Sequence, residues 1–203
     1  PEANDIWACT FHSACVRILR RDAEKLGFPS NFSIYDTSDS TSLIKHIIKD
    51  FNLDDKTYAP KVVLGAISRA KDQQIGAQEY LRQAKASGDL FRSKTGEIYA
   101  EYMRRMFAAG AMDFDDLIFF TVQLLQEHED ARTYWQRRFR YVLIDEYQDT
   151  NRLQYLLSSL LAGGFGNICV VGDDDQSIYK FRGATIENIL SFESQYKKCR
   201  TIR

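Results

Sequence analysis

Two adjacent acids, Asp145 and Glu146, follow an apolar run, and carboxylates can bind a metal ion or accept a proton from water. The run before them, residues 141–144, reads Tyr-Val-Leu-Ile and predicts a strand buried on both faces of a parallel sheet. Ligands of open α/β sheets bind just beyond the carboxyl ends of the strands, so we expect both carboxylates at the rim of the sheet. There, one carboxylate can hold Mg²⁺ and the next can orient an attacking water. The alternative is a pair of solvated acids at a strand end.

A second apolar strand is predicted over residues 167–173, and it also ends in an acid. Beyond it come an amide, Gln176, the aromatic residues Tyr179 and Phe181, and the cation Arg182. Flat rings beside cations suit unpaired bases and their phosphates, because every base offers a π-face. The alternative is that these rings are core residues flanked by solvated charges.

Four segments of the sequence resemble signatures of the superfamily 1 DNA helicases of the UvrD/Rep/PcrA type. The segments DEYQDTN (145–151), with Gln154 after it, and GDDDQSIYKFRGA (172–184) are similar to motifs II and III of that family. The segment TFHS (10–13) resembles an early DNA-contacting segment, and DFDDLI (113–118) resembles a further signature. The four segments come in the family's order and span nearly the whole chain.

The resemblance implies an ATP-dependent helicase that moves 3′ to 5′ on single-stranded DNA and unwinds duplex. It implies that Asp145 holds Mg²⁺, that Glu146 activates water and that Gln176 senses the γ-phosphate of ATP. Gln176 is close in sequence to Tyr179, so one short segment can link nucleotide state to base stacking. For His12 taken alone, a packed core histidine is an alternative to a DNA contact. The residues implied to contact DNA are Thr10, Phe11, His12, Ser13, Tyr179, Phe181 and Arg182.

The sequence departs from the family's pattern in two respects. Phe181 stands where Trp is the commonest residue, and Phe keeps a stacking face but loses ring area and the indole N–H. No Gly-x-x-x-x-Gly-Lys-Ser/Thr loop occurs, although that loop cradles the phosphates of bound nucleotides. In the family this loop precedes the TFHS segment, and a second motor core follows. We therefore expect the chain to be a piece of a longer protein and to be inactive by itself.

The composition sets limits on the class of protein. The chain has 203 residues, with 44% hydrophobic and 27% charged residues, which is ordinary for a globular protein. Its net charge of −1 offers no bulk basic field, so DNA binding must depend on a local patch and on stacking. Four scattered cysteines and three histidines argue against a zinc site and for a reducing compartment. No apolar run approaches the ~20 residues of a membrane span, and no signal peptide is visible. With the resemblance, we expect a bacterial cytoplasmic, nucleoid-associated protein.

The fold class expected is α/β: a partial RecA-like P-loop NTPase core with a parallel sheet, interrupted by an all-helical insertion. The core is predicted over residues 1–30 and 113–203, and the insertion over residues 31–112. The first part is expected to hold a strand at 6–10 and a helix from Ser13 to about Leu26. Helices are also predicted to end near Phe51 and to cover 60–71, 77–86, 90–109, 114–127, 131–138, a stretch after 151, and 186–192.

Two groups of basic residues have alternative interpretations. Arg17, Arg20 and Arg21 can meet a phosphate backbone or form a solvated face, and the same choice applies to Lys61, Arg69 and Lys71 in the insertion. The resemblance puts the insertion near a junction of single-stranded and duplex DNA, with DNA-repair or replication proteins as partners. Two rival functions stay open: a single-strand-binding module without turnover, and a subunit of an AddA or RecB type helicase–nuclease.

Overall fold

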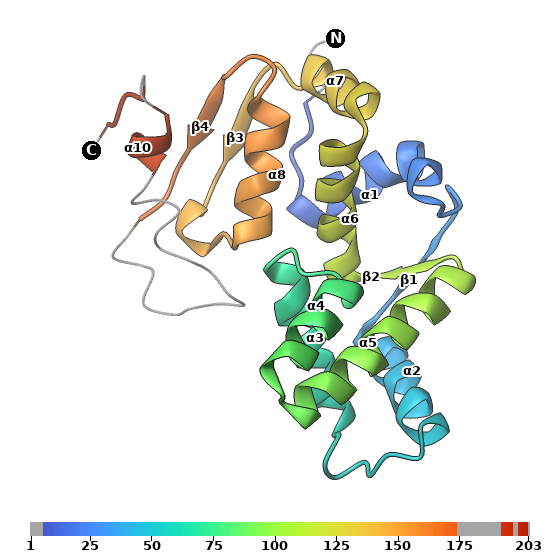
Figure 1. Cartoon of the computed structure of the whole chain (residues 1–203). Coiled ribbons are helices and arrows are strands. Elements are labelled where there is room, and N and C mark those ends of the chain that lie inside the picture. Colours follow the sequence, from blue (N-terminus) through green and yellow to red (C-terminus); the bar gives the residue numbers. More distant parts are fainter. Residues whose placement is uncertain (1–5, 174–191, 197–198, 203) are drawn as a thin grey trace. The chain divides into compact units, whose positions relative to one another are not determined.

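The computed structural model describes residues 6–173, 192–196 and 199–202. The chain divides into two compact units, Pro1–Leu124 and Leu125–Arg203. Figure 1 shows the helices and strands with their labels. The boundary between the units lies within helix α6 (Phe114–Glu127).

The first unit begins differently from what the sequence predicts. Residues 6–10 have no regular structure, and Ile6 is 72% exposed, so the predicted buried strand is wrong. A strand is stable only beside a neighbour, and among the described residues none pairs with this segment. Helix α1 (Phe11–Asp22) follows, and Thr10 rather than Ser13 caps it, since the Thr10 side chain accepts the backbone N–H of Ser13. A 3₁₀ turn, Ala23–Leu26, continues the helix to Gly27, which ends it with a φ of +83°.

A short parallel pair of strands brackets the helical stretch of this unit. Strand β1 (Ser33–Tyr35) pairs with β2 (Ala111–Asp113), so that Ile34 lies opposite Met112. The expectation of an all-helical stretch over residues 31–112 is therefore wrong at both of its ends. Strands this short carry too few residues to show a periodic pattern. The helices between them agree with the prediction to within a residue or two, and they are α2 (Thr37–Asp50), α3 (Pro60–Asp72), α4 (Ala77–Ser87) and α5 (Leu90–Ala108).

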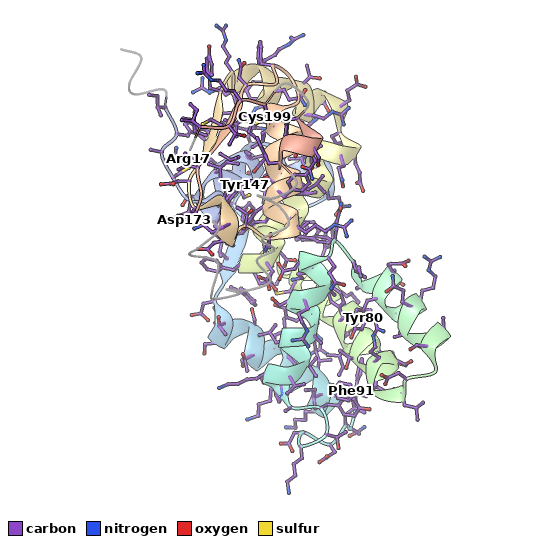
Figure 2. The ribbon with its side chains drawn as sticks, turned by 90° about the vertical axis from the view of Figure 1, so that its left-hand side faces the viewer. Arg17, Tyr80, Phe91, Tyr147, Asp173 and Cys199 are labelled. Atoms are coloured by element: carbon purple, nitrogen blue, oxygen red, sulfur yellow. The ribbon has the colours of Figure 1, made fainter. Side chains whose placement is uncertain are left out.

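Helices α2 to α5 enclose an apolar core. Helix α4 packs most extensively on α5, and the backbones come close at Gly96, where a Cβ atom would lie 3.0 Å from the Cα of Leu81. Figure 2 labels Tyr80 in this block, whose ring contacts Tyr99 edge-on. Phe91, also labelled there, stacks on Tyr58 with an angle of 4° between the rings. Fully buried members of the core include Ile44, Ile47, Val63, Ile98, Tyr102 and Met106.

The second unit contains the two predicted strands that end in acids. Strand β3 (Val142–Ile144) pairs in parallel with β4 (Ile168–Val170), and helix α8 (Arg152–Ala162) connects them. Helix α8 lies against β3, as Figure 1 shows. Helices α7 (Glu129–Arg138) and α10 (Phe192–Gln195), a 3₁₀ turn at Tyr147–Asp149 and the end of α6 complete the described part of the unit. The predicted helix over residues 186–192 lies outside the described residues except at Phe192.

The strand β3 is not buried on both faces, contrary to the prediction. Leu143 is 75% exposed, and its register partner Cys169 is exposed too, whereas Ile144 is buried. An apolar run indicates that a strand belongs in an interior, but it does not indicate which segment covers each face. Among the described residues, none therefore covers the face of this sheet that carries Leu143 and Cys169.

The observed fold is a mixed helix and strand architecture with short parallel sheets, so the α/β class is confirmed at that level. The RecA-like core, its insertion and the division at residues 30/31 and 112/113 stay predictions. None of the helices in the described ranges combines the length and the apolar composition needed to cross a bilayer.

Candidate nucleotide and nucleic-acid sites

The carboxyl ends of β3 and β4 lie side by side, as expected for parallel neighbours. The backbone N–H of Val171 donates to the carbonyl of Ile144 at 2.8 Å, and the N–H of Tyr147 donates to the carbonyl of Val171 at 2.9 Å. The pairing thus continues past the ends of both strands. It brings the Asp145–Glu146 pair beside the segment that ends at Asp173. Figure 2 labels Tyr147 and Asp173, which follow β3 and β4 respectively.

Asp145 is exposed at this edge, and its Oδ1 accepts the backbone N–H of Glu146 at 3.0 Å. A carboxylate is the oxygen ligand that Mg²⁺ prefers, and Mg²⁺ usually takes only one or two carboxylates, with phosphates and water as its other ligands. Among the described residues there is no cluster of three or more His, Cys, Asp or Glu side chains that could hold a metal ion. The carboxylate of Asp145 is of a ligand type that Mg²⁺ accepts, and a magnesium ion at this position stays a prediction.

Glu146 has an unusual backbone conformation. Its φ is +51° and its ψ is +42°, the left-handed region that residues other than glycine rarely adopt. Such strain persists only where the surrounding structure enforces it, and it is frequent at functional sites. The side chain is exposed, and its Oε2 accepts a hydrogen bond from Nε2 of Gln148 at 2.7 Å.

Gln148 is a residue that the sequence interpretation did not single out. Its side chain is buried, with 1% of its surface exposed, and its Oε1 accepts the backbone N–H of Asp173 at 3.0 Å. One amide therefore joins the acid after β3 to the backbone after β4. The signal that could have found it is its place inside the DEYQDTN segment, two residues after Glu146.

The rest of the DEYQDTN segment anchors the acids. Tyr147 is fully buried, and this burial raises the pKa of its hydroxyl. Its ring contacts the ring of Phe192 edge-on, with 5.7 Å between the ring centroids. The hydroxyl of Thr150 donates to the carbonyl of Tyr147 at 2.7 Å. Asn151 and Gln154 then form a reciprocal capping box that starts α8. A helix and a buried ring thus hold the strand end in place.

The predicted DNA-contacting segment at residues 10–13 forms the start of α1. Thr10 is used as its cap, and the hydroxyls of Thr10 and Ser13 lie 3.0 Å apart. Phe11 and His12 are partly exposed, and the His12 ring lies 5.3 Å from the ring of Phe114. Phe114 itself is 52% exposed. The structure thus pairs His12 with a surface aromatic residue, which the sequence interpretation did not nominate although it belongs to the DFDDLI segment.

The arginines of α1 have partners inside the protein. Arg20 donates to the carbonyls of Ser30 and Phe32 at 2.9 and 2.7 Å, and its guanidinium lies 3.9 Å from the centre of the Phe32 ring. Arg21 pairs with Asp22 at 2.7 Å. Arg17, labelled in Figure 2, lies over the ring of Trp7. Arg20 therefore acts as a structural anchor for the turn before β1.

Lys71 is excluded as a duplex contact, because its side chain is fully buried. Its Nζ lies 2.7 Å from the carboxylates of both Asp113 and Asp116, and the hydroxyl of Tyr102 donates to Asp113 at 2.8 Å. Asp113 and Asp116 also cap the start of α6 by accepting each other's backbone N–H groups. The two acids of the DFDDLI segment thus hold an internal lysine.

The charges in this cluster are strongly coupled. Burial disfavours the Lys71 ammonium, but Asp116 and Asp113 outweigh burial and raise its pKa well above the ordinary value. Burial also opposes the charge on Asp113, but Lys71 outweighs it and lowers the pKa of Asp113. For Asp116, burial and the Asp113 charge outweigh Lys71 and raise the pKa to about 7.

Four predicted site residues, Gln176, Tyr179, Phe181 and Arg182, lie outside the described residues. Their roles therefore stay predictions. The structure brings Asp145 and Glu146 beside Asp173, from which the chain continues to these four residues. It also pairs His12 with Phe114.

The chain belongs to the UvrD/REP helicase family: the profile of the UvrD/REP helicase N-terminal domain matches residues 1–197. Among similar curated proteins is the ATP-dependent DNA helicase PcrA of Bacillus subtilis, 48% identical over 202 residues, which are 100% of this chain and 27% of that protein. The proteins of the same name from Staphylococcus epidermidis and Staphylococcus aureus are 46% and 45% identical, each over 201 residues, 99% of this chain and 27% of the relative. The chain thus spans about a quarter of the length of these relatives.

Proposed function

We propose that the chain is part of the first motor core of an ATP-dependent DNA helicase that moves 3′ to 5′ on single-stranded DNA and unwinds duplex. The observation that carries the proposal is the acid pair Asp145–Glu146 at the shared carboxyl edge of two parallel strands, in a chain of the UvrD/REP helicase family. Ligands of open α/β sheets bind at this edge.

The two acids have different roles in this proposal. Asp145 presents a carboxylate oxygen to the magnesium ion that accompanies ATP, and that ion supplies neutralising charge for the transferring phosphoryl group. Glu146 accepts a proton from the attacking water as it adds to the γ-phosphorus, and the β–γ bridging oxygen leaves with ADP. Gln176 senses the γ-phosphate. These residues sit on one strand end and on the segment after the neighbouring strand, so they can respond together to the nucleotide.

Single-stranded DNA is the proposed track of the motor. Thr10 and Ser13 offer hydroxyls at the start of α1, and Phe11 and His12 offer rings there. Phe114 extends the ring surface beside His12 because it is half-exposed at a centroid distance of 5.3 Å. The segment after β4 supplies Tyr179 and Phe181 for stacking on bases and Arg182 for a phosphate, in line with the way unpaired strands are bound.

We also propose the organisation that the sequence indicated: motor core over residues 1–30 and 113–203, with residues 31–112 as an insertion near a junction of single-stranded and duplex DNA. Lys61 and Arg69 of α3 are exposed and are the remaining candidates there for phosphate contacts. A bacterial cytoplasmic location and partners from DNA repair or replication belong to the same proposal.

The test uses the full-length protein that contains this chain, with Glu146→Gln compared with Glu129→Gln. Glu129 is exposed in the first turn of α7, so the control makes the same chemical change elsewhere on the same unit. We expect Glu146→Gln to bind ATP normally and to lose DNA-stimulated hydrolysis by ~10²–10⁴-fold, because Gln cannot take a proton from water. The control should hydrolyse ATP at the rate of the unmodified protein.

Near-normal hydrolysis by Glu146→Gln would show that Glu146 is a structural acid. A full-length protein with no DNA-stimulated hydrolysis at all would favour a single-strand-binding module instead. Cleavage of DNA by the full-length protein would favour the helicase–nuclease type.

A further inference from the structure

We infer that Gln148 is a positioning residue for ATP hydrolysis, which holds the carboxylate of Glu146 and ties it to the backbone of Asp173. This inference rests on the proposed function, because it assigns Glu146 the task of activating water.

The contacts of Gln148 define the orientation of its amide. A carboxylate can only accept from the amide nitrogen, and a backbone N–H can only donate to the amide oxygen. Nε2 lies 2.7 Å from Glu146 Oε2, and Oε1 lies 3.0 Å from the N of Asp173. Turning the amide over would break both hydrogen bonds, so Glu146 and the N–H of Asp173 together hold the amide in one orientation.

The burial of Gln148 makes this link firm. The side chain is 1% exposed, so a lost hydrogen bond cannot be replaced readily by bulk water. Glu146, by contrast, is exposed and would otherwise sample several rotamers. A hydrogen bond to Oε2 restricts the carboxylate and reserves Oε1 for the attacking water.

Asp173 is the residue from which the chain continues to Gln176 and Tyr179. A shift of the backbone at Asp173 would act on Oε1 of Gln148, and through the planar amide on the carboxylate of Glu146. In this way the segment proposed to sense ATP and to stack on DNA is connected mechanically to the acid that activates water. Glutamine suits the position because its amide has both a donor for Glu146 and an acceptor for the backbone N–H of Asp173. An ionised glutamate has no donor, and methionine, of similar length, has neither the donor nor the oxygen acceptor.

The experiment compares three variants in the full-length protein: Gln148→Glu, Gln148→Met and the control Gln154→Glu. Gln154 accepts from the backbone of Asn151 through its amide oxygen, an interaction that glutamate keeps, so the control adds the same charge without touching Glu146. Steady-state ATP hydrolysis with single-stranded DNA gives kcat and KM for each variant, and circular dichroism melts report folding.

We expect Gln148→Glu and Gln148→Met to lower kcat on the order of 10- to 100-fold near pH 7 with little change in KM, because a misplaced catalytic group costs rate more than binding.

An unchanged kcat in both Gln148 variants overturns the inference. A raised KM together with melting temperatures lowered in parallel also overturns it, because that result describes a purely structural glutamine. Should Gln148→Glu misfold, Gln148→Met still decides between these outcomes. An unmodified protein that does not hydrolyse ATP refutes the proposed function and the inference with it, whereas an active protein with unaffected variants refutes the inference alone.

Discussion

The ammonium of Lys71 lies 2.7 Å from the carboxylate of Asp113, although 42 residues separate the two positions in the chain. The contact joins the last turn of α3 to the end of β2, where α6 begins. Removing Lys71 would leave the carboxylates of Asp113 and Asp116 buried without their cation, which typically costs about 3–5 kcal/mol. The ion pair therefore fastens the helical block to α6.

Asp116 makes the stability of the chain depend on pH. Burial and the charge on Asp113 raise its pKa from 3.8 to about 7, so the folded chain keeps a proton that the unfolded chain releases. The free energy of unfolding should therefore fall as the pH rises between about 4 and about 7. We expect urea unfolding of the 203-residue chain to give a value lower at about pH 8 than at about pH 5 by more than about 1 kcal/mol.

The matched variants for this measurement are Asp116→Asn and Asp55→Asn. The first removes the titrating group and should flatten the pH dependence, and the second changes an exposed acid and should leave it unchanged. Histidines also change charge near neutral pH, but all of these chains share the same ones. An equally steep dependence in Asp116→Asn would contradict the role of Asp116.

The 203-residue chain by itself should not hydrolyse ATP at a useful rate. Its sequence has no Gly-x-x-x-x-Gly-Lys-Ser/Thr loop, so the transferring phosphoryl group lacks the lysine and backbone amides that cradle it. Phosphate release is measured with saturating Mg-ATP and single-stranded DNA, beside the full-length protein under the same conditions. Turnover by the chain alone on the order of ~1–100 s⁻¹ would contradict the prediction.

Stacking by the segment after β4 is tested with Tyr179→Ala in the full-length protein. If the ring stacks on bases, single-strand binding should weaken by ~1–3 kcal/mol with little dependence on base sequence. Phe181→Trp should hold or tighten binding, because the larger ring stacks over more area. Fluorescence anisotropy at fixed salt measures the affinity, since salt alone changes it greatly.

Tyr134→Ala serves as the control for this substitution, because Tyr134 is a surface aromatic residue of α7, 43% exposed. If Tyr179 is a core residue instead, Tyr179→Ala should lower the melting temperature markedly and affect DNA only through misfolding. Unchanged affinity in a well-folded Tyr179→Ala protein would end the stacking hypothesis.

The helices could be predicted from the sequence because their local signals agree with their packing. Pro60 at the first position of α3, the capping acid Asp36 of α2 and the capping acid Asp89 of α5 each mark a start. The strands of three residues, β1 and β2, could not be predicted, because their stability comes from pairing with a distant segment. Residues 6–10 show the converse error, since apolar residues there suggest a strand that no described neighbour completes.

The part of the candidate site that could be predicted is the part that depends on residue type and on position along the chain. Asp145 and Glu146 follow an apolar run, and the structure confirms that they lie at a parallel strand end. The hydrogen bonds of Gln148 depend on how two distant segments meet, and the burial of Lys71 depends on acids 42 or more positions away. A lysine in a helical pattern is ordinarily exposed, so its sequence context gives no warning of a buried ion pair.

The face of the β3–β4 sheet that carries Leu143 has a natural chemical probe. Cys169 is exposed there opposite Leu143, so an alkylating reagent can reach its sulfur in this chain. Cys15 should label slowly, since burial raises the pKa of its thiol to about 12 and the thiolate is the form that reacts. The labelling rate of Cys169, followed by mass spectrometry of its peptide, therefore reports whether further polypeptide shields that side of the sheet in the full-length protein.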